Sequence, residues 1–383
     1  MAAIRVLVVD DSVVIRRVLM AALTSDPAIE VVGSAIDGVA ALAKIPLLRP
    51  DLVTLDVEMP VMSGLETLRE IRKLYPKLPV IMFSTLTERG AATTLDALAL
   101  GASDYVTKPQ NTGGVEETRA RIQAELIPKV KGLCRRPEER KTVAGRRPEA
   151  RVFTPKPSSG RQRVDIVAIG SSTGGPNALA VLLPGITREF PVPIVMVQHM
   201  PPMFTRLLAE RLDRETSVRI YEGVEGQILK PGAVWIAPGD FHMRLVREGG
   251  TAHLTMNQEP PQNSCRPSVD VLFESAAQEY GSNVLGVVLT GMGCDGLRGA
   301  QCIRDAGGQV IVQDESSSVV WGMPGAVAAA GLANGVFSLE ELAGEIEERA
   351  QWNRLSGERK TPSSSRSWPS PKATEILKDH PRG

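Results

Sequence analysis

The sequence predicts two α/β domains joined by a polar linker. In each half, short runs rich in Val, Ile and Leu alternate with segments whose apolar residues recur at helical spacing. This alternation is typical of a parallel sheet covered by helices on both faces. The length of 383 residues suits two or three domains. Hydrophobic residues at 43% and charged residues at 23% are typical of globular chains and argue against a disordered or fibrous protein.

The first domain is expected over residues 1–131. Five strand-like runs are each followed by a segment with helical periodicity, which completes a (βα)5 domain. The runs are residues 4–9, 30–35, 51–55, 79–84 and 104–107, and the helical segments are 13–23, 38–45, 64–74, 91–100 and one from about residue 114.

The second α/β domain is expected over residues 164–349. Its strand-like runs are 164–170, 193–199, 283–291 and 309–314, and its helices begin near residues 176 and 204 or span 269–280, 296–306 and 339–349. Four shorter β-like runs, 218–223, 233–239, 241–246 and 252–257, predict an antiparallel excursion in the middle of a mainly parallel sheet.

Two segments lack a core pattern. Residues 132–163 are rich in Lys, Arg and Pro and predict a flexible basic linker. Residues 350–383 are rich in Ser, Pro and basic residues and predict a disordered tail.

The charge balance and the apolar runs exclude several classes of protein. With 44 basic and 44 acidic residues the net charge is zero, which favours neither a nucleic-acid nor a membrane partner. No apolar run approaches the ~20 residues that span a bilayer, and the N-terminus lacks a signal-peptide pattern, so we expect a cytoplasmic protein without membrane insertion. The four cysteines contain no C-x-x-C pair, which predicts reduced thiols rather than a zinc cluster or a disulfide framework.

Carboxylates follow the strands of the first domain. Asp10 and Asp11 end the first strand and Asp56 ends the third, and an open parallel sheet binds ligands outside the carboxyl ends of its strands. Such close carboxylates repel unless a hard cation neutralises them, and their oxygens suit Mg²⁺. Ser84 and Lys108 follow the fourth and fifth strands. Singly, each signal is more often a helix cap or a turn, but together they predict a place to hold a phosphoryl group on a carboxylate.

A second group of strand-end residues predicts nucleophilic catalysis. Residues 170–174 fit G-x-S-x-G between a predicted strand and helix, a context that exposes the central serine, Ser172. His199 ends the next strand and Asp295 follows another. A serine needs an imidazole to take its proton, and the imidazole needs a carboxylate to orient it. The chain order Ser, His, Asp differs from that of the α/β-hydrolases, so a different fold is expected.

Alternatives remain open for several of these residues. The G-x-S-x-G turn could instead cradle a phosphate or cap a helix. The glycine-rich loop 290–296 offers backbone N–H groups for an oxyanion hole, with Met292 as the candidate, and Thr173 next to Ser172 is a second candidate. His242 and His253 are expected to be solvated or structural, and Cys294 to be inert.

These motifs carry two family resemblances. VVDDS, LDVEMPVMSG, FSTLT and YVTKP, over residues 1 to about 130, resemble the flavodoxin-like receiver domain of two-component response regulators. The resemblance implies that Asp56 is the phospho-acceptor and that Asp10, Asp11, Asp56 and the backbone carbonyl of Glu58 hold Mg²⁺. It also implies that the phosphoryl group is sensed by Ser84, Lys108 and the aromatic switch residue Tyr105.

The second half resembles the catalytic domain of chemotaxis protein-glutamate methylesterases. IGSSTGGP, QHMPPMFTRLLAERL, RPSVDVLFESAA and LTGMGCDG carry this resemblance from about residue 164 to 349. It implies a triad of Ser172, His199 and Asp295, with no cofactor for the esterase chemistry. The implied substrates are glutamate γ-methyl esters, and often glutamines, on the cytoplasmic helices of chemoreceptors. The implied phosphodonor is a chemotaxis histidine kinase, and the unphosphorylated receiver is implied to restrain the esterase.

Three departures from that family pattern stand out. Cys265 precedes Arg266 where a histidine is expected, the linker is long and basic, and the chain extends beyond residue 349.

The alternative interpretations are a receiver-gated esterase or interaction module of a non-flagellar chemosensory pathway, a transcriptional regulator, and a scaffold without catalysis. A regulator would need a basic helix-turn-helix, and a scaffold would need a broken triad.

Overall fold

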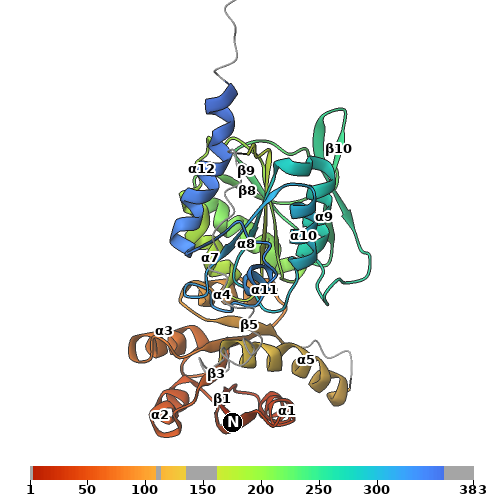
Figure 1. Cartoon of the computed structure of the whole chain (residues 1–383). Helices are drawn as coiled ribbons and strands as arrows, with labels where there is room; N and C mark the ends of the chain where they lie inside the picture. Colours follow the sequence, from red (N-terminus) through yellow and green to blue (C-terminus); the bar gives the residue numbers. More distant parts are fainter. Residues whose placement is uncertain (1–2, 109–113, 135–161, 358–383) are drawn as a thin grey trace, which may run out of the picture.

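In the computed structural model, residues 3–108, 114–134 and 162–357 are described. We call residues 3–134 the N-terminal unit and residues 162–357 the C-terminal unit. Figure 1 shows the N-terminal unit below and the C-terminal unit above, each a sheet flanked by helices. The linker prediction falls mainly on residues 135–161, which lie outside the described residues, and the tail beyond residue 357 does so as well.

The N-terminal unit contains a parallel sheet of five strands in the order β2-β1-β3-β4-β5, so the predicted flavodoxin-like (βα)5 architecture is confirmed. Its strands are β1 (Ile4–Val9), β2 (Ile29–Ala35), β3 (Leu52–Asp56), β4 (Val80–Ser84) and β5 (Asp104–Thr107). Its helices are α1 (Val13–Leu23), α2 (Gly38–Leu48), α3 (Gly64–Leu74), α4 (Glu88–Ala99) and α5 (Val115–Leu133).

Local sequence sets where these helices begin. The side chains of Ser12, Asp37 and Thr87 each accept a backbone N–H at the start of their helix. Ser63 and Glu66 form a reciprocal capping box at α3. Such caps satisfy backbone donors that have no partner within the helix. Because the five strands are parallel, their carboxyl ends form one open rim.

The C-terminal unit contains a parallel sheet of seven strands in the order β14-β13-β12-β6-β7-β9-β8. These strands are β6 (Ile166–Ser171), β7 (Ile194–Gln198), β8 (Arg219–Glu222), β9 (Ala233–Ile236), β12 (Val284–Val288), β13 (Gln309–Gln313) and β14 (Gly335–Phe337). The predicted antiparallel excursion is confirmed but is smaller than the four β-like runs suggested. It consists of the hairpin β10 (His242–Glu248) and β11 (Thr251–Asn257), while β8 and β9 join the parallel sheet.

Helices cover both faces of this sheet. They are α7 (Gly175–Leu182), α8 (Pro202–Glu215), α9 (Val269–Tyr280), α10 (Leu297–Asp305), α11 (Met323–Ala329) and α12 (Leu339–Gly357). Two short 3₁₀ turns, η1 (Leu183–Gly185) and η2 (Gly281–Asn283), follow α7 and α9. The predicted end of the last helix at residue 349 is wrong, because α12 continues to Gly357 and Ala350 is fully buried.

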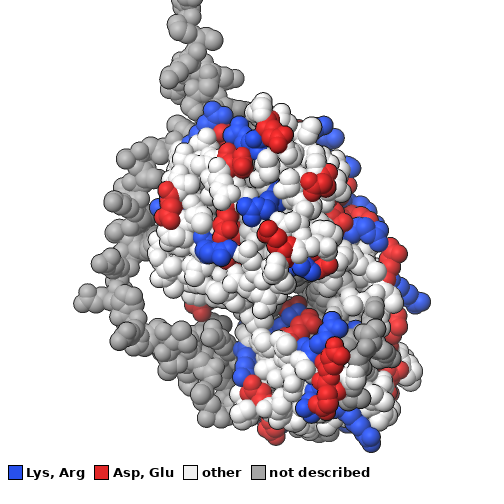
Figure 2. Space-filling view, turned by 90° about the vertical axis from the view of Figure 1, so that its right-hand side faces the viewer, with Lys and Arg blue, Asp and Glu red and all other residues white. Residues whose placement is uncertain are grey.

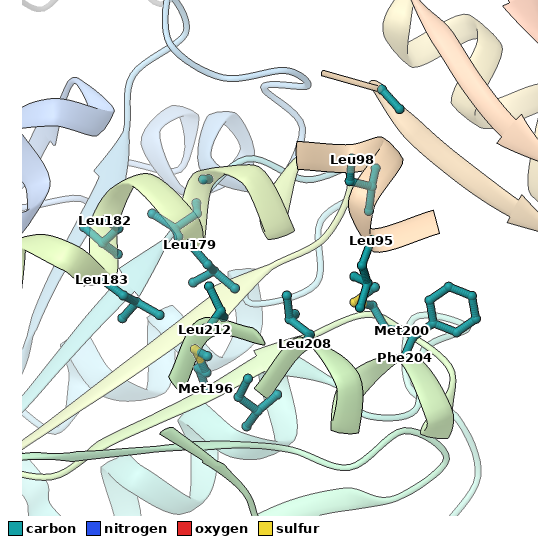
Figure 3. Close-up of a cluster of buried hydrophobic side chains, with 14 of the residues drawn as sticks. Leu95, Leu98, Leu179, Leu182, Leu183, Met196, Met200, Phe204, Leu208 and Leu212 are labelled. Carbon is teal, nitrogen blue, oxygen red and sulfur yellow. The ribbon is translucent and has the colours of Figure 1, made fainter. Parts of the chain in front are cut away.

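The two units pack against each other through α4 of the N-terminal unit and α7 and α8 of the C-terminal unit. Figure 3 shows Leu95 and Leu98 of α4 facing Leu179, Met200 and Leu208. All five side chains are buried in one continuous apolar cluster. At the rim of this contact, Arg211 Nη1 donates to the carbonyl oxygen of Leu95 at 2.8 Å, and Arg206 pairs with Glu88. The rim at the carboxyl ends of β6 and β7 therefore faces the N-terminal unit.

The surface carries basic and acidic side chains side by side, in agreement with the net charge of zero. On the face in Figure 2, Lys and Arg lie interspersed with Asp and Glu over both units. Within the described part of the chain, no helix is long and apolar enough to cross a membrane.

Candidate active site

The rim of the N-terminal sheet brings together four of its predicted residues, namely Asp10, Asp11, Asp56 and Lys108. Lys108 Nζ lies 2.7 Å from Asp56 Oδ2 and 3.2 Å from Asp10 Oδ2. Asp10 and Asp56 are buried, and one carboxylate oxygen from each of Asp10, Asp11 and Asp56 falls within a set whose atoms all lie within 4.8 Å of one another. The Lys108 ammonium contacts two of these three carboxylates. The donor set therefore fits a hard divalent cation such as Mg²⁺.

Burial and charge pairing act in opposite directions on the pKa values in this pocket. Desolvation raises the pKa of Asp56 above its ordinary value, and the nearby Lys108 opposes this rise. Desolvation lowers the pKa of Lys108, but its contacts with Asp56 and Asp10 outweigh burial and hold this pKa above its ordinary value. Glu58 and Asp11 line the cleft beside Asp56.

Ser84 contacts α4, and Tyr105 contacts the C-terminal unit. Ser84 ends β4, and its hydroxyl donates to the carbonyl oxygen of Gly90 within α4 at 3.1 Å. Tyr105 is buried, and its ring stacks on Phe204 of the C-terminal unit with the ring centroids 4.7 Å apart. Tyr105 therefore contacts the other unit directly, which its place in the sequence does not reveal.

Ser172 lies in a tight turn between β6 and α7. Gly174 has φ of +78°, a conformation that side chains rarely adopt, and a Cβ on Gly291 would meet Ser172 Cβ at 2.9 Å. The Ser172 N–H donates to the carbonyl oxygen of Thr290, and its own carbonyl accepts from Gln198 Nε2. Two neighbouring strand ends thus fix the backbone of Ser172 at the rim.

His199 and Asp295 form a hydrogen-bonded pair at the same rim. His199 Nε2 lies 2.8 Å from Asp295 Oδ2. A carboxylate only accepts, so Nε2–H donates and Nδ1 is the nitrogen left to take a proton. Among the described residues, no hydrogen bond joins Ser172 Oγ to His199, although both side chains line one cavity.

Asp295 is held by the N-terminus of α9. Its carboxylate accepts from the N–H groups of Val269 and Asp270, from the Ser268 hydroxyl and from Asn263 Nδ2, at 2.7–3.1 Å. The first turn of a helix offers free N–H groups and a positive dipole end, both of which favour a carboxylate anion. Sequence reasoning missed these donors, although Ser268 before the helical pattern at 269–280 is a typical cap.

The pKa values of the pair shift in opposite directions. Burial would raise the pKa of Asp295, but the hydrogen bonds from His199, Val269 and Ser268 hold it far below its ordinary value. Burial lowers the pKa of His199, but its hydrogen bonds with Asp295 and Cys265 outweigh burial and hold this pKa well above its ordinary value of 6.5. An ionised Asp295 therefore favours the protonated form of His199.

Both units line the cavity above Ser172, which has a volume of about 800 Å³. The N-terminal unit contributes Asp104, Tyr105, Glu125 and Lys129, among others. Thr173 Oγ1 donates to Asp104 Oδ2 at 2.8 Å, a direct bond between the residue after Ser172 and the N-terminal unit. Thr173 and Met292 also line this cavity, and their backbone N–H groups donate no hydrogen bond within the described residues.

The remaining histidines and cysteines that the structure describes range from fully buried to exposed. His242 is fully buried with Nε2 at 3.3 Å from the Pro260 carbonyl oxygen, and His253 lies in β11 on the hairpin. Neither His242 nor His253 lines the cavity that Ser172 and His199 share. Cys294 is exposed. Cys265, by contrast, lies 3.6 Å from His199 Nδ1, which the sequence did not predict.

The N-terminal unit has a five-stranded sheet with an acidic rim. It is docked on a second α/β unit that carries Ser, His and Asp at its own rim. Together the two units define a response regulator whose output unit is a hydrolase. Family models agree with this class. Residues 6–118 match the response regulator receiver domain, and residues 167–346 match the CheB methylesterase domain.

The chain belongs to the protein-glutamate methylesterase/protein-glutamine glutaminase family. A relative of that name from Trichodesmium erythraeum is 53% identical over 347 residues, covering 90% of this chain and 98% of the relative. One from a Nocardioides strain is 50% identical, covering 93% and 98%.

Solved structures from Thermotoga maritima match each unit in turn. The CheB methylesterase catalytic domain is 43% identical with a TM-score of 0.48, covering 48% of this chain and 98% of that one. The response regulator domain of CheB is 46% identical with a TM-score of 0.31, covering 34% and 94%.

Proposed function

We propose that this protein hydrolyses glutamate γ-methyl esters on the cytoplasmic helices of chemoreceptors, releases methanol, and deamidates receptor glutamines. The observation that carries the proposal is that His199, which is hydrogen-bonded to Asp295, lines the same cavity as Ser172. The names of the relatives support this substrate class. The site of action is then the cytoplasm.

The esterase mechanism follows from the roles of these groups. Ser172 Oγ attacks the ester carbonyl carbon while His199 Nδ1 takes the hydroxyl proton, and Asp295 stabilises the imidazolium that forms. The backbone N–H groups of Thr173 and Met292 would hold the oxyanion. The imidazolium then protonates the leaving methoxide, which departs as methanol. Water, deprotonated by His199, attacks the acyl carbon; the bond to Ser172 Oγ breaks, the imidazolium returns the proton to that oxygen, and the glutamate is released. A glutamine follows the same steps with ammonia as the leaving group.

The N-terminal unit is the regulatory half in this proposal. Asp56 would accept a phosphoryl group from a chemotaxis histidine kinase, with Mg²⁺ held by Asp10, Asp11, Asp56 and the Glu58 carbonyl. The cation would neutralise the carboxylates and the phosphoryl oxygens. Lys108 already lies 2.7 Å from Asp56, where it can contact an added phosphoryl group.

Phosphorylation would reach the esterase through α4 and β5. Ser84 bonds to α4 at Gly90, and Tyr105 stacks on Phe204 of the C-terminal unit. A rearrangement of Ser84 and Lys108 toward a phosphoryl group would disturb both contacts. Since the N-terminal unit also lines the cavity above Ser172, its displacement would admit a bulky helical substrate.

The direct test is methanol release from a methyl-labelled chemoreceptor. We expect the full-length protein to release volatile label in the presence of a phosphodonor, and to release ammonia from receptor glutamines. Heat-inactivated protein is the control. Absence of label release from receptors that a known methylesterase does demethylate would contradict the proposal.

The raised pKa of His199 predicts the pH dependence. A general base works in its neutral form, so a raised pKa leaves little active base at neutral pH. We expect initial rates of methanol release to rise by about tenfold per pH unit below this pKa, with a midpoint above the ordinary ~6.5. In Asp295→Asn the midpoint should move to lower pH, because the carboxylate that raises it is gone. A rate that is flat or falls from about pH 6 to 9 would contradict this role for His199.

A further inference from the structure

Cys265 occupies the position facing the free nitrogen of His199. Its Sγ lies 3.6 Å from His199 Nδ1, and His199 Nε2 lies 2.8 Å from Asp295. The three side chains therefore form a continuous thiol, imidazole and carboxylate series. This is the series that activates a cysteine as a nucleophile, since the imidazole takes the thiol proton and the carboxylate stabilises the resulting imidazolium.

The thiol of Cys265 also lies where a small reagent can reach it. Cys265 lines the same cavity of about 800 Å³ as Ser172 and His199. Cys265 is partly exposed, and the other polar contact of its sulfur among the described residues is the carbonyl oxygen of Asn263 at 3.4 Å. Cys265 and Ser172 thus share one cavity and one base.

We propose that Cys265 is a covalent modification site for small soft electrophiles, and that its modification stops the esterase. In the step with iodoacetamide, the thiol gives its proton to His199 Nδ1 and the thiolate sulfur attacks the CH₂ carbon. A C–S bond forms, the C–I bond breaks and iodide leaves, while the imidazolium returns its proton to water. The product places a carbamidomethyl group in the cavity beside Ser172 and removes the sulfur as a partner for His199. This inference rests on the proposed role of His199 as the base.

The other cysteines provide internal controls. Cys294 is more exposed than Cys265 and has no contact with a histidine among the described residues. If exposure alone set the reactivity, Cys294 would react faster. If the imidazole sets it, Cys265 would react faster despite being less exposed.

The test is residue-resolved alkylation of the full-length protein with limiting iodoacetamide at neutral pH, read by peptide mass spectrometry. We expect Cys265 to be labelled about tenfold faster than Cys294, and His199→Gln to remove this difference. The Cys294 rate in that variant reports folding, because unfolding would raise the labelling of all cysteines together. Equal rates for the two cysteines, or a Cys265 rate that His199→Gln leaves unchanged, would overturn the proposal.

Methanol release measured on the same samples tests the consequence for activity. We expect the activity of the unmutated protein to fall in proportion to Cys265 labelling, whereas Cys265→Ser keeps its own starting rate under the reagent. Full activity after complete Cys265 labelling would overturn the inhibitory role. An untreated protein that releases no methanol would instead defeat the proposed function, and the labelling rates would still decide whether the thiol is activated.

Discussion

Replacing Ser172 with alanine is expected to lower methanol release by a factor of about 10⁴ or more. Without the hydroxyl no acyl-enzyme forms, and His199 with the oxyanion donors can only polarise the ester. Folding should be little affected, because Ser172 is held through backbone bonds to Thr290 and Gln198 that alanine retains. The measurements are the initial rate with labelled receptor and the thermal unfolding midpoint of each variant.

Cys294→Ala is the matched control for Ser172→Ala. Cys294 adjoins Asp295 in the chain but is exposed and has no contact with His199 among the described residues. We expect its rate to stay close to that of the unmutated protein. Near-normal methanol release by Ser172→Ala would show that another group is the nucleophile.

Removing residues 1–150 is expected to raise basal esterase activity by about tenfold or more. A tenfold rise corresponds to a full-length protein in which roughly nine molecules in ten are in the closed, inactive arrangement. The N-terminal unit lines the cavity above Ser172, and Asp104 bonds to Thr173 beside the nucleophile. The deletion removes both restraints and leaves His199 and Asp295 in place. The measurement is methanol release without phosphodonor for the fragment and the full chain.

A point variant tests the same restraint in the full-length protein. Arg211 on α8 donates to the Leu95 carbonyl oxygen and lies 3.3 Å from Asp96 on α4. Arg211→Glu should repel Asp96, weaken the contact and raise the basal rate. Arg214→Glu, exposed on the same helix, should not. Equal basal rates for the full chain, the fragment and Arg211→Glu would show that the N-terminal unit does not restrain catalysis.

The sequence predicted the features that repeat along the chain. The apolar runs predicted the strands. The positions of Asp10 and Asp56 after two strands predicted one rim, and the positions of Ser172 and Asp295 after two others predicted a second rim. The pattern failed where the signal was weak. The strand β14 is three residues long, α11 contains Pro and Gly, and α12 continues through a polar stretch that has little apolar periodicity.

The groups that tune the candidate site could not be predicted in the same way. Asn263 approaches Asp295 across 32 positions, and Asp104 approaches Thr173 across 69 positions. Such contacts depend on how loops and whole units pack, and no local spacing encodes them. The contact of Cys265 with His199 is of this kind, although an unexpected cysteine in a matching motif pointed to its position.

The central claim is that phosphorylation of Asp56 releases an esterase whose nucleophile is Ser172. It is tested most directly by initial rates of methanol release from labelled receptor, with and without a small-molecule phosphodonor and Mg²⁺, for the unmutated protein and Asp56→Asn. To change the ratio of open to closed molecules from 1:99 to 99:1, phosphorylation must favour the open arrangement by about 5.5 kcal/mol of free energy. A new contact between the phosphoryl group and Lys108 contributes to this free energy. We predict that the phosphodonor raises the rate of the unmutated protein, that chelation of Mg²⁺ abolishes this rise, and that Asp56→Asn takes up no phosphoryl label and keeps its basal rate throughout. Equal stimulation of Asp56→Asn, or no stimulation of the unmutated protein, would contradict the claim.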